Sequence, residues 1–153
     1  MPDNKPPKEI VINTGPIIAL IAGLGNLDIL SEIYSKVVVP FEVSQEILSG
    51  GASGFGVKEF LRAKNIDVQK TPSTISPFLL NSLDAGEASV IQTALDLNIS
   101  RVCIDETVGR RMARLNNLSL TGSIGILIQA KKEGAAFAID TVMQKMKTHG
   151  IWL

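Results

Sequence analysis

Carboxylate and amide side chains occur in this chain where apolar runs end or helical patterns begin. Asn13 follows the run EIVI, and Asp105 and Glu106 follow RVCI. Glu46 lies in the helical pattern after KVVV, and Glu87 lies in the first turn of another helical pattern. Converging carboxylates repel one another unless a cation or a proton lies among them. Such oxygen ligands suit Mg²⁺ or Mn²⁺, which can activate water and stabilise the leaving oxygen of a phosphodiester. These residues therefore indicate a metal-dependent hydrolytic site.

The elements that must position these residues alternate between strands and helices. Short β-branched runs predict strands at 9–12, 36–39, 66–68, 101–104 and 118–121. Apolar periodicity and capping residues predict helices at 16–24, 26–34, 41–48, 57–64, 84–98, 107–116, 123–133 and 138–148. This alternation is typical of an α/β fold with a mostly parallel sheet and helices on both faces. We expect a tail at 1–8, one domain at 9–153 and a flexible loop at 49–56.

The carboxyl ends of parallel strands meet at one edge of a sheet, where ligands bind. All the candidate acids fall at this predicted edge, and the set is more informative than any one member. Each has a simpler explanation when taken alone. Glu87 could oppose a helix dipole, Asp105 could be an N-cap, Glu46 could be a solvated helix residue, and Asn13 could cap a helix or shape a turn.

Composition excludes several classes of protein. Fifteen basic and fifteen acidic residues balance to zero net charge, which argues against binding long duplex DNA by electrostatics alone. One cysteine and one histidine exclude a disulfide framework and make an internal zinc site untenable. The N-terminal segment does not resemble a signal peptide, and the longest apolar run is too short to cross a bilayer. We therefore expect a soluble, cytoplasmic protein with no membrane partner.

Basic and hydroxyl side chains near the candidate acids could bind the phosphates of a substrate. Arg110 and Arg111 belong to the helical pattern after Glu106, and a guanidinium fork fits phosphate oxygens. The hydroxyls of Thr14, Thr121 and Ser123 could also reach the site. The alternatives are a solvated helix face for the arginines and helix caps for the hydroxyls.

Several motifs together give a resemblance to a known family. They are VINTGPIIAL, VVVPFEVSQEIL, LDAGEASVIQTAL, VCIDETVGRRMARLNNLSLTGSIGILIQAKKEG and the closing helix through GIWL. The combination resembles PIN domains, in the subgroup related to VapC-type toxins. That resemblance implies an α/β/α sandwich and a ribonuclease that depends on Mg²⁺ or Mn²⁺. It also implies RNA as substrate, an antitoxin protein as a partner, and a homodimer.

The resemblance assigns roles to the acids and exposes one departure from the family pattern. Glu46 corresponds to the second acid, Glu87 to the third, and either Asp105 or Glu106 to the fourth. The first position usually holds Asp, whereas this chain has Asn13. Asparagine offers a metal only a neutral oxygen, so cation binding should weaken. Three interpretations therefore remain open: a ribonuclease, a non-catalytic module that binds RNA or protein, and a protein-interaction domain without a nucleic-acid role.

Overall fold

A computed structural model describes residues 8–50 and 53–151 of the chain. The expected tail therefore lies outside the described residues except for Lys8, whose carbonyl accepts a hydrogen bond from the Ser35 amide at 2.8 Å. Residues 51 and 52 of the expected glycine-rich loop also lie outside this range.

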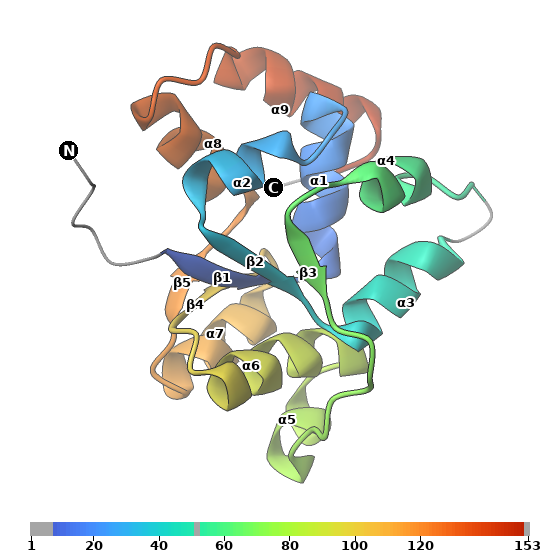
Figure 1. The fold of residues 1–153 in the computed structure, drawn as a ribbon, viewed down its shortest axis with the longest axis vertical. Helices are drawn as coiled ribbons and strands as arrows, with labels where there is room; N and C mark the ends of the chain where they lie inside the picture. Colours follow the sequence, from blue (N-terminus) through green and yellow to red (C-terminus); the bar gives the residue numbers. More distant parts are fainter. Residues whose placement is uncertain (1–7, 51–52, 152–153) are drawn as a thin grey trace.

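The sheet consists of parallel strands in the order β3-β2-β1-β4-β5 (Figure 1). These strands are β1 (Glu9–Ile12), β2 (Lys36–Val39), β3 (Ile66–Val68), β4 (Arg101–Cys103) and β5 (Ser119–Thr121). The strand β1 is central and pairs with both β2 and β4. The predicted parallel sheet is confirmed, and so are all the predicted strand positions to within one residue.

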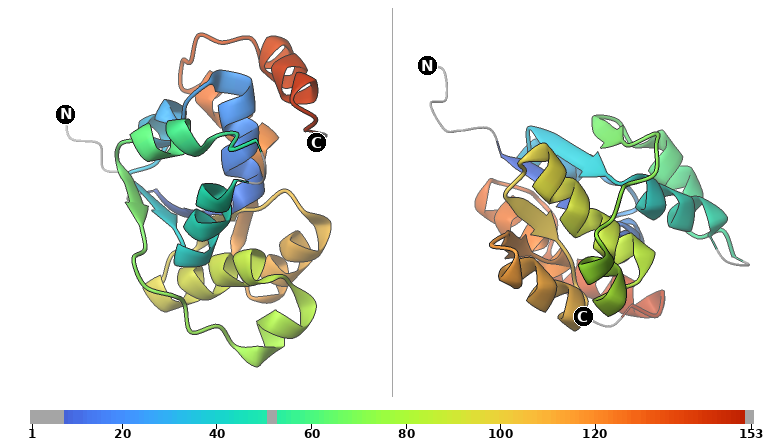
Figure 2. Two further views of the ribbon diagram at one scale, coloured as in Figure 1. Left: turned by 90° about the vertical axis from the view of Figure 1, so that its right-hand side faces the viewer. Right: turned by 90° about the horizontal axis from the view of Figure 1, so that it is seen from below.

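Helices cover both faces of the sheet, as the sequence predicts. They are α1 (Thr14–Leu24), α2 (Asp28–Ile33), α3 (Phe41–Ser49), α4 (Val57–Arg62), α5 (Pro77–Ser82), α6 (Ala85–Leu97), α7 (Thr107–Leu115), α8 (Ser123–Lys132) and α9 (Ile139–Thr148). Figures 1 and 2 show α6 and α7 on one face, with α5 beside α6, and α1, α2, α8 and α9 on the other. The three layers form an α/β/α sandwich.

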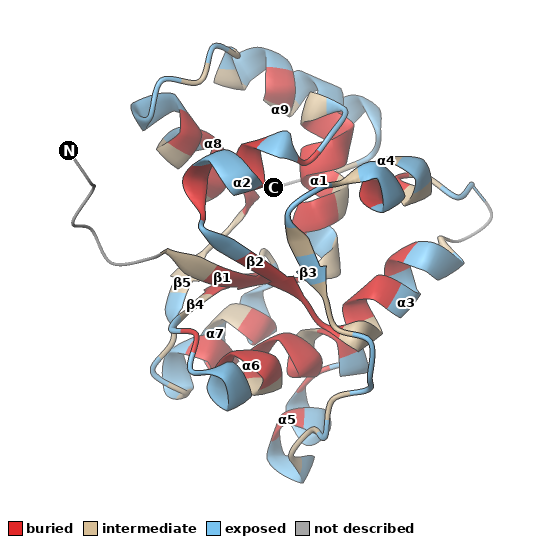
Figure 3. Cartoon of the chain, in the orientation of Figure 1, coloured by how far each residue is buried: buried red, intermediate tan, exposed pale blue. Residues whose placement is uncertain are grey.

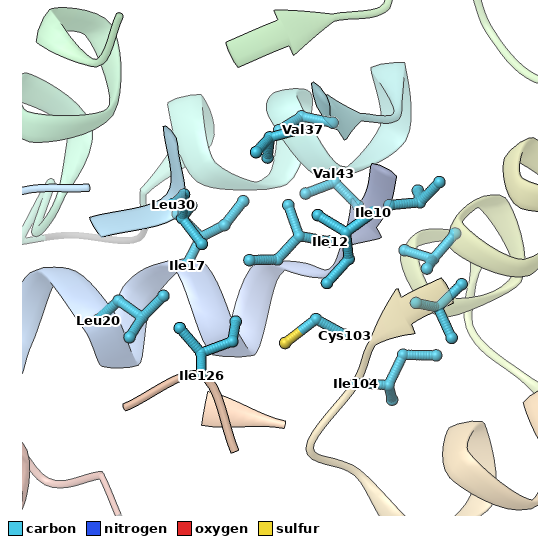
Figure 4. Packing of buried hydrophobic residues seen from close by; sticks show 14 of the residues in the cluster. Ile10, Ile12, Ile17, Leu20, Leu30, Val37, Val43, Cys103, Ile104 and Ile126 are labelled. Atoms are coloured by element: carbon cyan, nitrogen blue, oxygen red, sulfur yellow. The ribbon is translucent and has the colours of Figure 1, made fainter. Parts of the chain in front are cut away.

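The core lies between the sheet and its two layers of helices (Figure 3). Ile10, Val11 and Ile12 of β1 are fully buried, because the central strand is covered on both faces. Around them pack Ile17 and Leu20 of α1 and side chains from β2, β4 and α8 (Figure 4). Burying each such side chain contributes roughly 1.5–3 kcal/mol of stability. Each buried strand therefore ends where its apolar residues give way to polar ones.

The helix α5 is the element that the sequence interpretation missed. Ser76 caps it by accepting a hydrogen bond from the Leu79 amide at 3.4 Å, and Pro77 occupies the first turn. Only Leu79 of this helix is buried. A helix of six residues with one buried side chain shows no apolar period, so its sequence was indistinguishable from a loop.

No helix within the described ranges is both long enough and apolar enough to span a membrane.

Candidate functional site

The candidate site lies where the strand order reverses. The chain moves outward from β1 to β2 and β3, then returns to the other side of β1 as β4. Segments after β1 and β4 therefore diverge to opposite faces and leave a crevice at the carboxyl edge, where ligands bind in open α/β sheets. Asn13 follows β1 here. Its backbone N–H donates a hydrogen bond to the Cys103 carbonyl of β4 at 3.1 Å.

Asn13 is a buried polar residue at the end of β1. Only 7% of the residue is exposed, and its backbone carbonyl accepts the Ile17 amide in the first turn of α1. Asn13 is the N-cap residue of α1, as one of the two expectations had it, but its side chain makes no capping hydrogen bond.

Gly86, in the first turn of α6, lets several polar atoms gather. A Cβ added to Gly86 would lie 2.7 Å from Glu46 Oε2, 3.6 Å from Asp84 Oδ1 and 3.9 Å from Asn13 Oδ1. Real side chains do not tolerate the first of these distances. A side chain at position 86 would therefore displace the Glu46 carboxylate from the start of α6.

The Glu46 carboxylate also accepts a hydrogen bond from the first residue of α1. The Thr14 hydroxyl donates a hydrogen bond to Glu46 Oε2 at 3.0 Å. Thr14 thus contacts one of the predicted acids and does not cap a helix.

The neighbouring acids change the pKa of the Glu87 carboxyl group. Burial, and then the carboxylates of Asp84, Glu106 and Glu46, raise the pKa of Glu87 from an ordinary 4.5 to about 7. All the charges that shift this pKa are negative, so the carboxylates repel one another without a compensating cation. We call the group formed by Asn13, Glu46, Asp84, Glu87 and Glu106 the acidic cluster.

Asp105 and Glu106 serve different neighbours although they are adjacent in the sequence. Glu106 is the N-cap of α7, where its Oε1 accepts the Val108 amide at 3.1 Å and its Oε2 accepts the Gly109 amide at 2.8 Å. The same carboxylate lies beside Glu87, because a Cβ on Gly109 would be 3.6 Å from Glu106 Oε2 and 3.9 Å from Glu87 Cδ. The cap expected at Asp105 is therefore provided by Glu106.

Asp105 instead joins the end of β4 to the start of α8. Its Oδ1 accepts the Ser123 amide at 2.8 Å, and its Oδ2 accepts the Ser123 hydroxyl. Ser123 is fully buried and is not the cap of α8, since Gly122 occupies that position.

Arg110 lies on the same side as Asp105. Its Nη1 donates hydrogen bonds to the carbonyls of Ile104 at 2.8 Å and Thr121 at 3.3 Å. The Thr121 hydroxyl bonds the Gly122 carbonyl at 3.4 Å, and Arg111 is exposed. Arg110 thus ties the ends of β4 and β5 together. We call Asp105, Arg110, Thr121 and Ser123 the strand-end clasp.

The sequence of this chain matches the model of a PIN-domain family, DUF3368, over residues 9–153. The chain belongs to the PIN-domain family. PIN domains are typically nucleases and commonly use divalent metals. No curated protein matches the sequence.

The acidic cluster of this PIN domain has the donor chemistry of a Mg²⁺ or Mn²⁺ site. Its ligand atoms are carboxylate and amide oxygens, which hard cations prefer. Within residues 8–50 and 53–151, no three histidine, cysteine, aspartate or glutamate side chains stand close enough together to hold a metal as oriented.

Asp84 is the member of the acidic cluster that the sequence interpretation missed. It is the N-cap of α6, and its Oδ1 accepts the Glu87 amide at 2.9 Å. The signal was its position three residues before Glu87, which places both carboxylates at the same end of one helix.

Proposed function

We propose that this PIN domain is a metal-dependent endoribonuclease that hydrolyses RNA phosphodiesters. The observation that carries the proposal is the acidic cluster. Oxygens of Glu46, Asp84 and Asn13 lie within 4 Å of the position of a Cβ on Gly86, and the carboxylates of Asp84, Glu106 and Glu46 raise the pKa of Glu87. Such crowding costs stability, and a divalent cation would relieve it.

Residues of the acidic cluster would hold the cation. Glu46, Glu87 and Glu106 supply charged oxygens, and Asn13 supplies a neutral one. When bound, Mg²⁺ or Mn²⁺ supplies an activated water and stabilises charge on the phosphodiester oxygens. The Thr14 hydroxyl orients Glu46, and the first amides of α7 orient Glu106. Glu87 has a pKa of about 7 and would serve as a ligand in its deprotonated form.

The arginines of α7 would contact the phosphates of the substrate. Arg111 is exposed on α7, and Arg110 is half-buried with its Nη1 fixed by two carbonyls. Guanidinium groups bind phosphate oxygens in a fixed geometry. The hydroxyls of Thr121 and Ser123 are bonded within the protein, so we assign them to positioning the strand ends. Asp105 is assigned to the same clasp, and Glu106 to the cation.

A nuclease assay tests this proposal. Purified protein is incubated with a single-stranded RNA in Mn²⁺, in Mg²⁺ and in EDTA. We expect cleavage that requires the metal and that falls at least a hundredfold in Glu87→Gln, equal to roughly 3 kcal/mol of transition-state stabilisation. Glu32→Gln is the matched control, because Glu32 is exposed on α2, just before β2 and at the opposite edge of the sheet. Equal cleavage by wild type and Glu87→Gln would reject the proposal.

Asn13 supports a second candidate, a PIN module that binds RNA or protein without cleaving it. The neutral amide withholds one charge from the cation. Calorimetric titration of Mn²⁺ into the wild type and Asn13→Asp separates the two candidates. The module is favoured if only Asn13→Asp binds the ion and cleaves RNA.

We further propose that the domain is the toxin of a toxin–antitoxin pair and acts as a homodimer. Support comes from the family assignment and from exposed apolar side chains on α5, where Phe78 is 62% exposed and Leu80 is 47% exposed. Light scattering on the purified protein gives the oligomeric state, and a monomer at all concentrations would reject the dimer. Growth arrest on expression, relieved by a small protein encoded beside it, would support the toxin role.

A further inference from the structure

A pocket lies at the far end of α1 from Asn13, between α1, α4 and α9. Both α4 and α9 contact α1 (Figures 1 and 2). The pocket has a volume of about 290 Å³ and is lined by the end of α1 and by Phe55, Glu59, Lys145 and His149. An α-helix rises about 1.5 Å per residue, so the two ends of α1 are roughly 16 Å apart. The pocket is therefore distinct from the acidic cluster.

One carboxylate oxygen of this pocket is buried without a hydrogen bond. Within residues 8–50 and 53–151, Glu59 Oε2 is the buried side-chain oxygen or nitrogen atom that has no hydrogen-bond partner. Buried polar atoms generally have a partner, and a charged oxygen removed from water is costly unless a counter-charge pairs with it. Lys145 lines the same pocket from α9, but it is exposed and its amine makes no hydrogen bond with this oxygen. Glu59 Oε2 is therefore available to a donor from a ligand.

The other walls of the pocket also favour a positive charge. Ala22, Gly23 and Leu24 end α1, and the carbonyl end of a helix carries partial negative charge. The last turn of α1 has no basic side chain to offset this charge. The ring centroids of Phe55 and His149 are 4.8 Å apart, and aromatic faces attract both cations and apolar stems. The pocket therefore combines an anionic oxygen with an aromatic wall.

We propose that this pocket binds a guanidinium or primary ammonium group on an apolar stem, with Glu59 as its counter-ion. Such groups present several N–H donors to a carboxylate, and their charge strengthens the hydrogen bonds. They occur on free alkylamines and alkylguanidines, and on the lysine and arginine side chains of other proteins. The inference does not depend on the proposed nuclease activity, because none of the residues that line the pocket belongs to the acidic cluster or the strand-end clasp.

NMR titration of the whole protein in EDTA tests the inference. The probes are n-butylguanidinium, its neutral analogue n-butylurea, and the peptide acetyl-Gly-Arg-Gly-amide, and the amide signals of Gly25, Phe55 and His149 are followed. We expect the two guanidinium probes, but not n-butylurea, to shift these signals to saturation. Glu59→Gln keeps the shape of the side chain and should weaken binding at least about tenfold. Asp140→Asn, on the exposed first turn of α9, is the matched control and should bind as the wild type does.

The two guanidinium probes distinguish the sources of the ligand. Tighter binding of the peptide than of n-butylguanidinium would assign the pocket to a side chain of another protein. Equal or tighter binding of n-butylguanidinium would assign it to a free small molecule.

Thermal unfolding without a probe tests whether Glu59 has a structural role instead. Because Glu59 Oε2 has no partner among the described residues, Glu59→Gln should unfold at the wild-type temperature or above it. Lys145→Gln should bind the guanidinium probes at least as tightly as the wild type. A lower unfolding temperature in Glu59→Gln would show that the carboxylate is paired within the protein and would overturn the inference. Equal binding by the wild type and Glu59→Gln, equal shifts with n-butylurea, or no saturable shift in the wild type would overturn it as well.

Discussion

The acidic cluster and the strand-end clasp lie side by side at one edge of the sheet, but the carboxylates in them have opposite surroundings. In the clasp, both oxygens of Asp105 accept hydrogen bonds from the buried Ser123. In the acidic cluster, the carboxylates of Asp84, Glu46 and Glu106 raise the pKa of Glu87. A carboxylate satisfied within the protein stabilises the fold, whereas carboxylates that repel one another store free energy that a cation can release.

Asp105→Ala should break the clasp and have the largest effect on stability. The substitution leaves the Ser123 amide and hydroxyl buried without their acceptor, which should lower the free energy of unfolding by about 3 kcal/mol. Urea denaturation in EDTA measures the loss, with Asp140→Ala as the surface control. If stability is retained and Mn²⁺ binding is lost, Asp105 belongs to the ion site and the contrast between the two regions fails.

Gly86→Ala should damage the acidic cluster without unfolding the protein. The new Cβ would lie 2.7 Å from Glu46 Oε2 and displace that carboxylate, while alanine favours the helix. We expect Mn²⁺ affinity to fall about tenfold in calorimetry. Gly15→Ala is the matched control, because a Cβ there meets nothing within 4 Å. Unchanged affinity in Gly86→Ala would mean that Glu46 is not a ligand.

Glu87→Gln should change how the stability of the metal-free protein depends on pH. The pKa of Glu87 rises from 4.5 to about 7 on folding, so the folded state holds more protons between these values. The free energy of unfolding should therefore fall as pH rises through this window. Glu87 is half-buried, so after allowance for solvent screening the fall is about 1 kcal/mol.

Urea denaturation in EDTA between pH 4.5 and pH 8 measures this dependence. Glu87→Gln should remove the fall and be the more stable protein at pH 8. Parallel profiles for the two proteins would show that the acidic cluster imposes no strain on Glu87.

Thr14→Val should have the smallest effect. It removes the hydrogen bond to Glu46 Oε2 at an exposed position, so stability should change by less than about 0.5 kcal/mol. Mn²⁺ affinity should fall about threefold, equal to roughly 0.6 kcal/mol. Thr14→Ser keeps the hydroxyl and should bind as the wild type does. A larger loss in both variants would point to packing of the threonine methyl group.

The sequence predicted most of the fold because its strongest signals are local. The runs EIVI and KVVV are buried strands, and the polar residues after them lie at the edge where parallel strands end. The same reasoning could not separate Asp105 from Glu106, since their roles depend on contacts with Ser123 and Glu87 that lie far along the chain. Asp84 was missed for a related reason. Its sequence signature is that of a capping residue, and only the neighbourhood of Gly86 shows that Glu46 and Asn13 lie beside it.

The central place of β1 has a consequence for how the protein is made. Asn13 and Glu46 emerge early in synthesis, but Asp84, Glu87 and Glu106 follow much later, and β4 must insert beside β1 to bring them together. A nascent chain that ends before β4 carries Glu46, Asp84 and Glu87 but lacks Glu106 and the strand that pairs with β1 on this side. The proposed site is therefore complete only after most of the domain has been synthesised and β4 has paired with β1.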